Sequence, residues 1–297
     1  MDDTITPNQV LAMVAGAISQ DLRADIIIVG SLAASYQLLR DSAQAVRTKD
    51  VDGMVAPHAR ALQSATRVAD RLLGEGWVPQ ASADYDLPGT AQTRDERLAV
   101  VRLKPPGSDA WFLELLGAPP TVALEVNASG RQGRRLQTVG GHFELPSFAY
   151  LGLVQFEPTL SEFGVRIALP EMMALANLLH HPTIGEAVMG QIFAGRKIKR
   201  VNKDLGRVVA LAFLADQRDE NALESWRSRW QMALSALAPE QSKQLMSRAL
   251  SGLQTLLDSP SDMEQALHTV NNGLLSATPM RADQFVIALR RLLQALS

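Results

Sequence analysis

Two carboxylates stand one residue apart in an apolar stretch that otherwise has the pattern of a buried strand. In DVDGMVA, residues 50–56, Asp50 and Asp52 alternate with Val51 and Gly53. Side chains two apart on a strand project from the same face, so these carboxylates would be neighbours. Neighbouring carboxylates repel each other unless a cation lies between them, and Mg²⁺ favours carboxylate and phosphate oxygens. The pair therefore predicts a magnesium site that acts on a phosphate-bearing substrate.

A phosphate-binding element and a third acid are expected nearby. The apolar run DIIIVG ends at Gly30, and a helix-like stretch begins at Ser31. Gly30 lets the backbone approach a ligand closely, and the start of a helix offers free N–H groups to an anion. In WFLELLG, Glu114 is the one acid of a strongly apolar stretch. These parts predict a two-metal phosphoryl or nucleotidyl transfer site, in which Asp50 and Asp52 hold metal and Glu114 completes the acidic set or acts as base.

Each part also has a purely structural interpretation. A Gly-Ser pair after a strand commonly forms a turn, and an Asp-x-Asp pair commonly lies on a solvated face. Glu114 could lie at a sheet edge or in a buried ion pair. The order of the parts along the chain, each next to an expected strand, favours the functional interpretation.

Hydrophobic periodicity predicts the elements that position these residues. Expected strands in the first part of the chain are 25–30, 50–56, 97–105, 110–117, 121–127 and 141–146. Expected helices there are 8–20, the stretch from Ser31, and 58–76. The Arg-rich segment 128–141, with Arg131, Arg134 and Arg135, is expected to be a loop that is either solvated or bound to a polyanion.

The chain changes character after about residue 165, where nearly every segment acquires helical period. We therefore expect an α/β (α+β) domain over 1–165, with a mixed sheet and flanking helices, and a mostly helical domain over 166–297. A ligand site is expected in the cleft between the two domains.

The stretch VGSLAASYQLLR, followed by RTKDVDGMV, resembles the signature of the nucleotidyltransferase superfamily. More narrowly it resembles the AbiEii-type toxin branch, in which an Arg and a Ser or Thr precede the acid pair, as Arg47 and Thr48 do here. The resemblance implies a nucleotidyltransferase-like sheet and Mg²⁺-dependent transfer of a nucleoside monophosphate from a nucleoside triphosphate to an acceptor. It implies that Gly30, Ser31, Arg47 and Thr48 contact the nucleotide. The acceptor, which could be RNA, a protein side chain or a small molecule, stays open, and a toxin–antitoxin or phage-defence context with an antitoxin partner is implied.

The second half is similar to the same branch at Pro170, Glu171, Lys203 and Asp204. Asn177 stands where the family helix carries a triphosphate-binding Lys, and Arg207 stands where a final acid is usual. Either phosphate binding has moved to Lys203 or Arg200, or the activity and substrate differ from those of the typical toxin. These departures keep a second hypothesis open, a non-catalytic member of the fold that serves as a binding or interaction module.

Two further groups of residues are candidates for binding a polyanion or a metal ion. The run GRKIKRVNK, residues 195–203, could bind a triphosphate or RNA, or could be a solvated linker before a helix. His180 and His181 invite a metal site, but adjacent helical residues point to different faces, so we expect histidines at a helix end.

The composition excludes several classes of protein. The 297 residues include no cysteine, carry a net charge of −2 and are 46% apolar, which excludes disulfides, thiolate metal sites and a global attraction to polyanions. No apolar run approaches the roughly 20 residues that cross a bilayer, and the first residues lack the order of a signal peptide. We therefore expect a cytoplasmic protein without a membrane partner.

Overall fold

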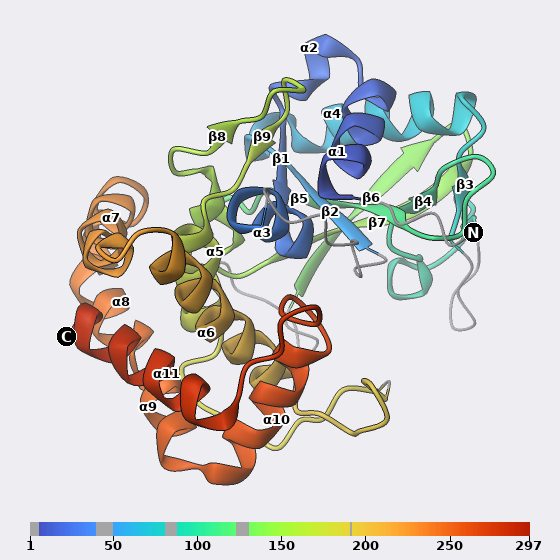
Figure 1. Cartoon of the computed structure of the whole chain (residues 1–297). Coiled ribbons are helices and arrows are strands. Elements are labelled where there is room, and N and C mark those ends of the chain that lie inside the picture. Colours follow the sequence, from blue (N-terminus) through green and yellow to red (C-terminus); the bar gives the residue numbers. More distant parts are fainter. Residues whose placement is uncertain (1–5, 40–49, 81–87, 123–130, 191) are drawn as a thin grey trace. The chain divides into compact units, whose positions relative to one another are not determined.

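The structure, a computed structural model, describes residues 6–39, 50–80, 88–122, 131–190 and 192–297 (Figure 1). The chain divides into two compact units, and the division falls between Leu169 and Pro170, close to the boundary expected at residue 165. Residues 37–39 group with the second unit. The first unit combines helices with a mixed sheet and the second is helical, which confirms the expected mixed α/β class with a helical C-terminal region.

Within the described part of the first unit, seven strands form one mixed sheet in the order β3-β4-β5-β2-β1-β9-β8. Their bounds are β1 Ile26–Val29, β2 Asp50–Val55, β3 Val78–Pro79, β4 Arg102–Lys104, β5 Phe112–Gly117, β8 Thr159–Leu160 and β9 Arg166–Ile167. β1 pairs antiparallel with β2 and parallel with β9, and β2 pairs parallel with β5. The β-branched residues of β1 are buried on both faces, as is typical of a central strand.

Three of the helices described in the first unit match expected ones, and the short α2 was not expected. The helices described there are α1 Pro7–Ala17, α2 Gln20–Arg23, α3 Gly30–Leu38 and α4 His58–Gly74. Thr6 and Gln9 form a capping box at the start of α1, in which each side chain satisfies a backbone N–H of the first turn. One stripe of α4 is buried, including Ala61, Val68 and Leu72, so its amphipathic pattern correctly predicted a helix lying on a core.

Most of the described part of the Arg-rich segment is a strand, which corrects the expected loop there. β6 Arg131–Thr138 pairs antiparallel along its whole length with β7 Gly141–Phe148 (Figure 1). The Gly and Arg residues that suggested a loop are tolerated because the ladder to β7 satisfies the backbone, while Leu136 is fully buried. Backbone hydrogen bonds from Val101 N to Glu144 O and from Glu144 N to Ala99 O fasten the hairpin to the segment before β4.

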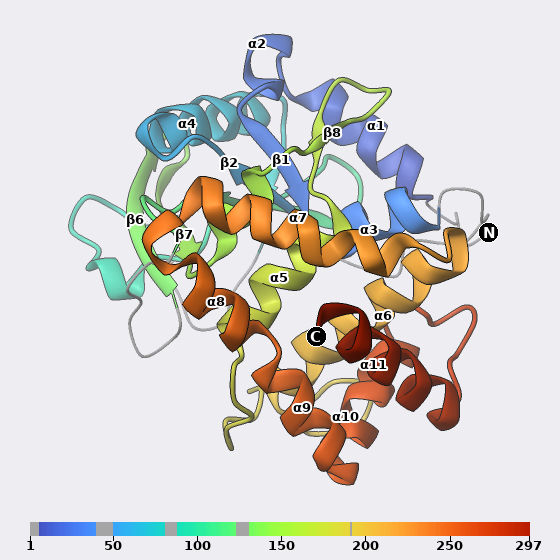
Figure 2. The ribbon, with the colours of Figure 1, turned by 90° about the vertical axis from the view of Figure 1, so that its left-hand side faces the viewer.

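In the second unit, α6 contacts most of the other helices, and Figure 2 shows it among them. The bounds are α5 Pro170–His180, α6 Arg200–Arg218, α7 Ala222–Leu237, α8 Ser242–Ala249, α9 Ser251–Asp258, α10 Pro260–Asn271 and α11 Ala282–Leu296. α6 packs closely against α10 because Gly206 faces the carbonyl of Ala266, and a Cβ at Gly206 would overlap that oxygen. Trp226 and Trp230 of α7 are buried in the core of this unit.

In the described ranges no helix has both the length and the apolar character that a bilayer span requires.

Candidate functional site

The site begins where β1 passes directly into α3. The chain leaves the buried strand at Val29 and enters the helix at Gly30, whose φ is +72°. A side chain at this position would be strained, and a Cβ built on Gly30 would overlap the carboxylate of Asp52. The glycine therefore allows the Asp52 carboxylate to lie against the first residue of a helix.

The sheet brings two of the three predicted acids into direct register. Asp52 of β2 pairs with Glu114 of β5 in the parallel ladder, and Asp50 pairs with Phe112. Register partners project from the same face of a sheet, and neighbouring strands lie about 4.8 Å apart. Asp50, Asp52 and Glu114 thus share one face, with Asp50 exposed, Asp52 half-buried and Glu114 buried. The register thus puts the three acids on one face, but they do not gather into a group of three side chains that could hold a metal ion.

Glu114 has a cationic partner that the sequence interpretation missed. Arg102 is the antiparallel register partner of Glu114 on β4, and its Nε lies 2.6 Å from Glu114 Oε2. The Glu114 side chain is 11% exposed and that of Arg102 is 45% exposed. The Arg102 guanidinium carbon also lies 5.6 Å from the centre of the Phe112 ring. Of the two structural alternatives for Glu114, the ion pair is the one observed.

Three charged side chains therefore lie side by side on adjacent strands. They are Asp52 of β2, Glu114 of β5 and Arg102 of β4, and Val29 of β1 pairs with Asp52 at the end of this row. The signal that could have identified Arg102 is present in the sequence: it is a cation at a strand position in VVRLKP, just as Glu114 is the lone acid of the next strand.

The donors for a metal ion at this face are carboxylate oxygens. Among the residues that the structure describes, no three His, Cys, Asp or Glu side chains gather as a metal-binding group. Asp50 and Asp52 fit Mg²⁺ nonetheless, because this ion is commonly held by one or two carboxylates while phosphate oxygens and water supply the remaining ligands. Glu114 is engaged with Arg102 and is not part of a three-carboxylate cage.

The other predicted nucleotide contacts are Ser31, Arg47, Thr48, Arg200 and Lys203. Ser31 is the second residue of α3 and is half-buried, whereas Arg47 and Thr48 lie outside the described residues. Arg200 and Lys203 belong to α6 of the second unit. Within that unit Arg200 Nε lies 3.6 Å from Asp204 Oδ2, and Lys203 Nζ lies 5.8 Å from the centre of the Phe193 ring.

A buried acid and two histidines form a separate polar cluster in the second unit. His181 Nε2 lies 2.9 Å from Asp204 Oδ2, and both residues are buried. Burial by itself raises the pKa of Asp204, but the hydrogen bond with His181 and the charges of Arg207 and Arg200 outweigh it and lower the pKa to about 2. Burial, aided by the neighbouring His181, lowers the pKa of His180 to about 4. Asp204 is thus an ionised anchor between the end of α5 and α6.

Two further residues of the second half, Glu171 and Asn177, make local structural contacts. The buried carboxylate of Glu171 binds Arg229 of α7 at 2.7 Å, and its carbonyl accepts the Trp230 indole N–H at 2.9 Å. The Asn177 amide donates to the carbonyl of Met173 one turn earlier in α5, at 3.0 Å. Glu171 therefore ties α5 to α7.

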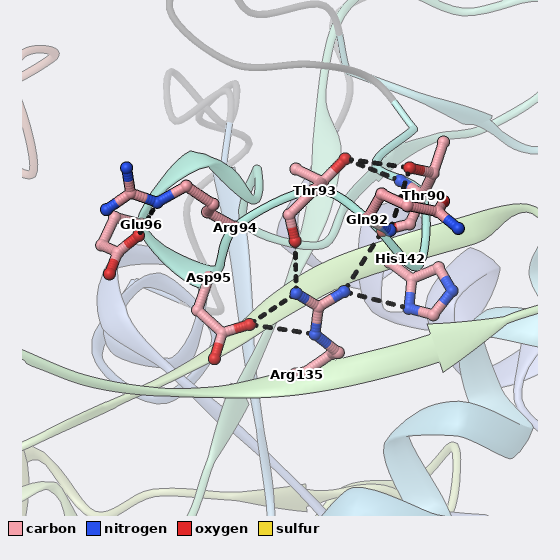
Figure 3. A network of polar contacts seen from close by, with 8 residues as sticks. All are labelled: Thr90, Gln92, Thr93, Arg94, Asp95, Glu96, Arg135 and His142. Atoms are coloured by element: carbon pink, nitrogen blue, oxygen red, sulfur yellow. Dashed lines mark hydrogen bonds and ion pairs between the residues drawn. The ribbon is translucent and has the colours of Figure 1, made fainter.

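Arg135 forms the most extensive hydrogen-bonded network of the β6–β7 hairpin (Figure 3). Its guanidinium binds the Asp95 carboxylate at 2.6 Å and donates to the carbonyls of Thr90 and Thr93. His142 Nδ1 lies 3.4 Å from Arg135 Nη1. Because every partner lies in the segment before β4 or on β7, this arginine fixes a loop to the hairpin and does not present its charge to a ligand.

The comparisons with known proteins add no relationship: no protein-family model and no curated protein matches the chain. The candidate site is consequently defined by its own residues, Gly30, Asp50, Asp52, Arg102 and Glu114. The resemblance to nucleotidyltransferases stays a prediction.

Proposed function

We propose that the first unit is a Mg²⁺-dependent nucleotidyltransferase that moves a nucleoside monophosphate from a nucleoside triphosphate to an acceptor. One observation carries the proposal. Asp52 is at once the register partner of Glu114 and the carboxylate packed against Gly30, the residue that begins α3. Metal-binding oxygen and a helix N-terminus that can accept phosphate are therefore adjacent, which is the combination that phosphoryl-transfer chemistry requires.

Each residue of this face would have its own role in the reaction. The acceptor hydroxyl oxygen attacks the α-phosphorus, the bond from that phosphorus to the β-bridging oxygen breaks, and pyrophosphate leaves. Asp50 and Asp52 would hold Mg²⁺, which supplies charge neutralisation on the phosphate oxygens when bound. The backbone N–H groups of Gly30 and Ser31 would hold the terminal phosphates.

Glu114 would take the proton of the acceptor hydroxyl. Its Oε2 is held by Arg102, and its Oε1 has no hydrogen-bond partner in the part of the chain that the structure describes. A fixed carboxylate with one oxygen open is suited to orienting a hydroxyl before it reacts. Additional positive charge for the triphosphate would come from Arg47 and Thr48, as the family resemblance implies, and from Arg200 or Lys203.

The acceptor would be RNA, a protein side chain or a small molecule, in a toxin–antitoxin or phage-defence setting with an antitoxin as partner. A non-catalytic binding module is the second candidate. This binding module is favoured by Asn177, which stands at the position of the family lysine. Its side-chain amide donates a hydrogen bond to the carbonyl of Met173.

The decisive experiment measures pyrophosphate release and nucleotide binding with and without Mg²⁺. Asp52→Asn keeps the shape of the side chain and removes its charge, so we expect at least a hundredfold loss of pyrophosphate release and loss of the Mg²⁺-dependent part of nucleotide binding. Asp109→Asn is the matched control, because Asp109 is an exposed residue between β4 and β5 that pairs with Lys104. Equal binding and turnover by both variants would contradict the catalytic proposal and favour the binding module.

A further inference from the structure

Arg134 carries its guanidinium on the apolar face of the β6–β7 hairpin. It pairs with Leu145 in the ladder, and Leu136, two residues further along β6, pairs with Phe143. Register partners and side chains two apart on a strand share one face of a sheet. Leu136, Phe143 and Leu145 are each at most 1% exposed, so the half-buried Arg134 shares its face with core side chains.

The positive charge of Arg134 is not balanced by a neighbour in the part of the chain that the structure describes. Its Nη2 is buried and makes no hydrogen bond to any described residue, whereas the next residue, Arg135, is engaged with Asp95. Burial lowers the pKa of the Arg134 guanidinium from its ordinary value, and no described carboxylate offsets that effect. Because an arginine stays protonated near neutral pH, a partly desolvated cation remains here.

The guanidinium lies beside the end of β5, next to the start of α4. A Cβ built on Gly117, the last residue of β5, would be 3.7 Å from Arg134 Nη2. The carbonyl oxygen of the next residue, Ala118, lies 2.8 Å from Nδ1 of His58, the first residue of α4. The first turn of α4 contains no acidic residue, and its N-cap, Pro57, makes no side-chain capping hydrogen bond. The helix start therefore adds partial positive charge at this end of β5.

We propose that Arg134 binds a phosphate group beside the end of β5. The planar N–H donors of a guanidinium match two oxygens of a phosphate, and a helix N-terminus favours the same charge. The site is separate from the acidic face, because Gly117 lies three residues beyond Glu114 on β5 and such residues project from opposite faces of a strand. The inference therefore does not depend on nucleotidyl transfer.

Thermal unfolding of the full chain, followed by circular dichroism, tests the site. Inorganic phosphate is added up to about 20 mM while chloride keeps the ionic strength constant, and glycerol 3-phosphate forms a second arm. We expect phosphate to raise the unfolding temperature of the wild-type chain with a dissociation constant of about 1 mM or below. Arg134→Gln should weaken this binding at least tenfold. A stronger response to glycerol 3-phosphate than to inorganic phosphate would identify a phosphomonoester as the ligand.

Two variants serve as controls for the phosphate response. Arg97→Gln removes an exposed arginine at the end of a short 3₁₀ helix and should respond as the wild type does. Asp52→Asn changes the acidic face and should also keep the response, which is measured without Mg²⁺ or nucleotide.

Stability without phosphate provides a second readout. Arg134→Gln removes a partly buried charge that has no described partner, so its urea midpoint should equal or exceed that of the wild type. A guanidinium that stabilises the fold through contacts within the chain would have the opposite effect.

The outcomes decide the proposal in either direction. No response of the wild-type chain, or equal responses of wild type and Arg134→Gln, overturns the site and leaves the proposed nucleotidyl transfer standing. A clear loss of stability or a failure to fold in Arg134→Gln without phosphate also overturns it, since the guanidinium would then have a partner within the chain. Arg134-dependent binding of a short single-stranded RNA, without a response to phosphate, would assign the arginine to a nucleic-acid surface instead.

Discussion

Asp52 and Glu114 face each other across the parallel ladder of β2 and β5, and only the first of them is placed against a helix N-terminus. The backbones of these two residues lie about 4.8 Å apart on neighbouring strands, and the side chains share one face of the sheet. The surroundings of the two carboxylates nevertheless differ. Asp52 packs on Gly30, while Glu114 pairs with Arg102. The two acids of this register pair therefore have different surroundings, one beside the start of a helix and one in an ion pair.

Gly30→Ala should damage both stability and the site. The added Cβ would require φ of +72° in a residue that avoids it and would overlap the Asp52 carboxylate. We expect a loss of about 1–3 kcal/mol in the free energy of unfolding and at least a tenfold loss of pyrophosphate release. Urea denaturation and the release assay measure these.

Gly16→Ala is the control for that substitution. Gly16 lies on the exposed side of α1, and nothing is within 4 Å of a Cβ built there. Because alanine is the better helix former, this change should raise stability by about 0.5–1 kcal/mol. Equal effects of the two substitutions would show that Gly30 has no special conformational role.

Arg229→Ala should destabilise the second unit. It would leave the buried carboxylate of Glu171 without its 2.7 Å partner, and since Arg229 is 40% exposed, water would make up part of the loss. We expect a decrease of about 2 kcal/mol in the free energy of unfolding, measured by circular dichroism in urea. Arg227→Ala removes the same charge from the exposed face of the same helix and should change stability by less than about 0.5 kcal/mol.

The half-buried His180 should make the protein less stable in mild acid. Burial lowers its pKa from 6.5 to about 4, so between these pH values the unfolded chain binds a proton that the folded chain does not. The free energy of unfolding should therefore fall as the pH falls from about 6.5 to 4, by about 2 kcal/mol after allowance for partial exposure. His180→Gln should flatten this part of the curve of stability against pH. A variant curve parallel to that of wild type would rule out His180 as the source.

Arg135→Lys should loosen the segment before β4. The guanidinium binds Asp95 and two backbone carbonyls at once, and an ammonium lacks the planar fork for those contacts. We expect faster hydrogen exchange in a peptide covering residues 90–97 and a loss of about 1–2 kcal/mol in stability. Arg94→Lys, whose side chain pairs with Glu96 at 3.4 Å on the surface, should leave exchange unchanged. Similar exchange in both variants would mean that the network does not hold the loop.

The sequence by itself determined the main elements and the positions of the acids. Period-two alternation placed Asp50 and Asp52 on one face of a strand, and the apolar runs around Gly30 and Glu114 marked two further strands. Helical period correctly separated a mixed α/β part from a helical part. These features are local, since they depend on how successive side chains alternate along one segment.

Tertiary structure alone decided which residues meet. The strand order β4-β5-β2-β1 and its registers made Glu114 the neighbour of both Asp52 and Arg102, and no spacing along the chain encodes that arrangement. Pairing with β7 also turned the Arg-rich segment into the strand β6, because a ladder of hydrogen bonds overrides a weak local preference for a loop. The sequence thus supplied a pair of acids, while the sheet placed Arg102 beside Glu114.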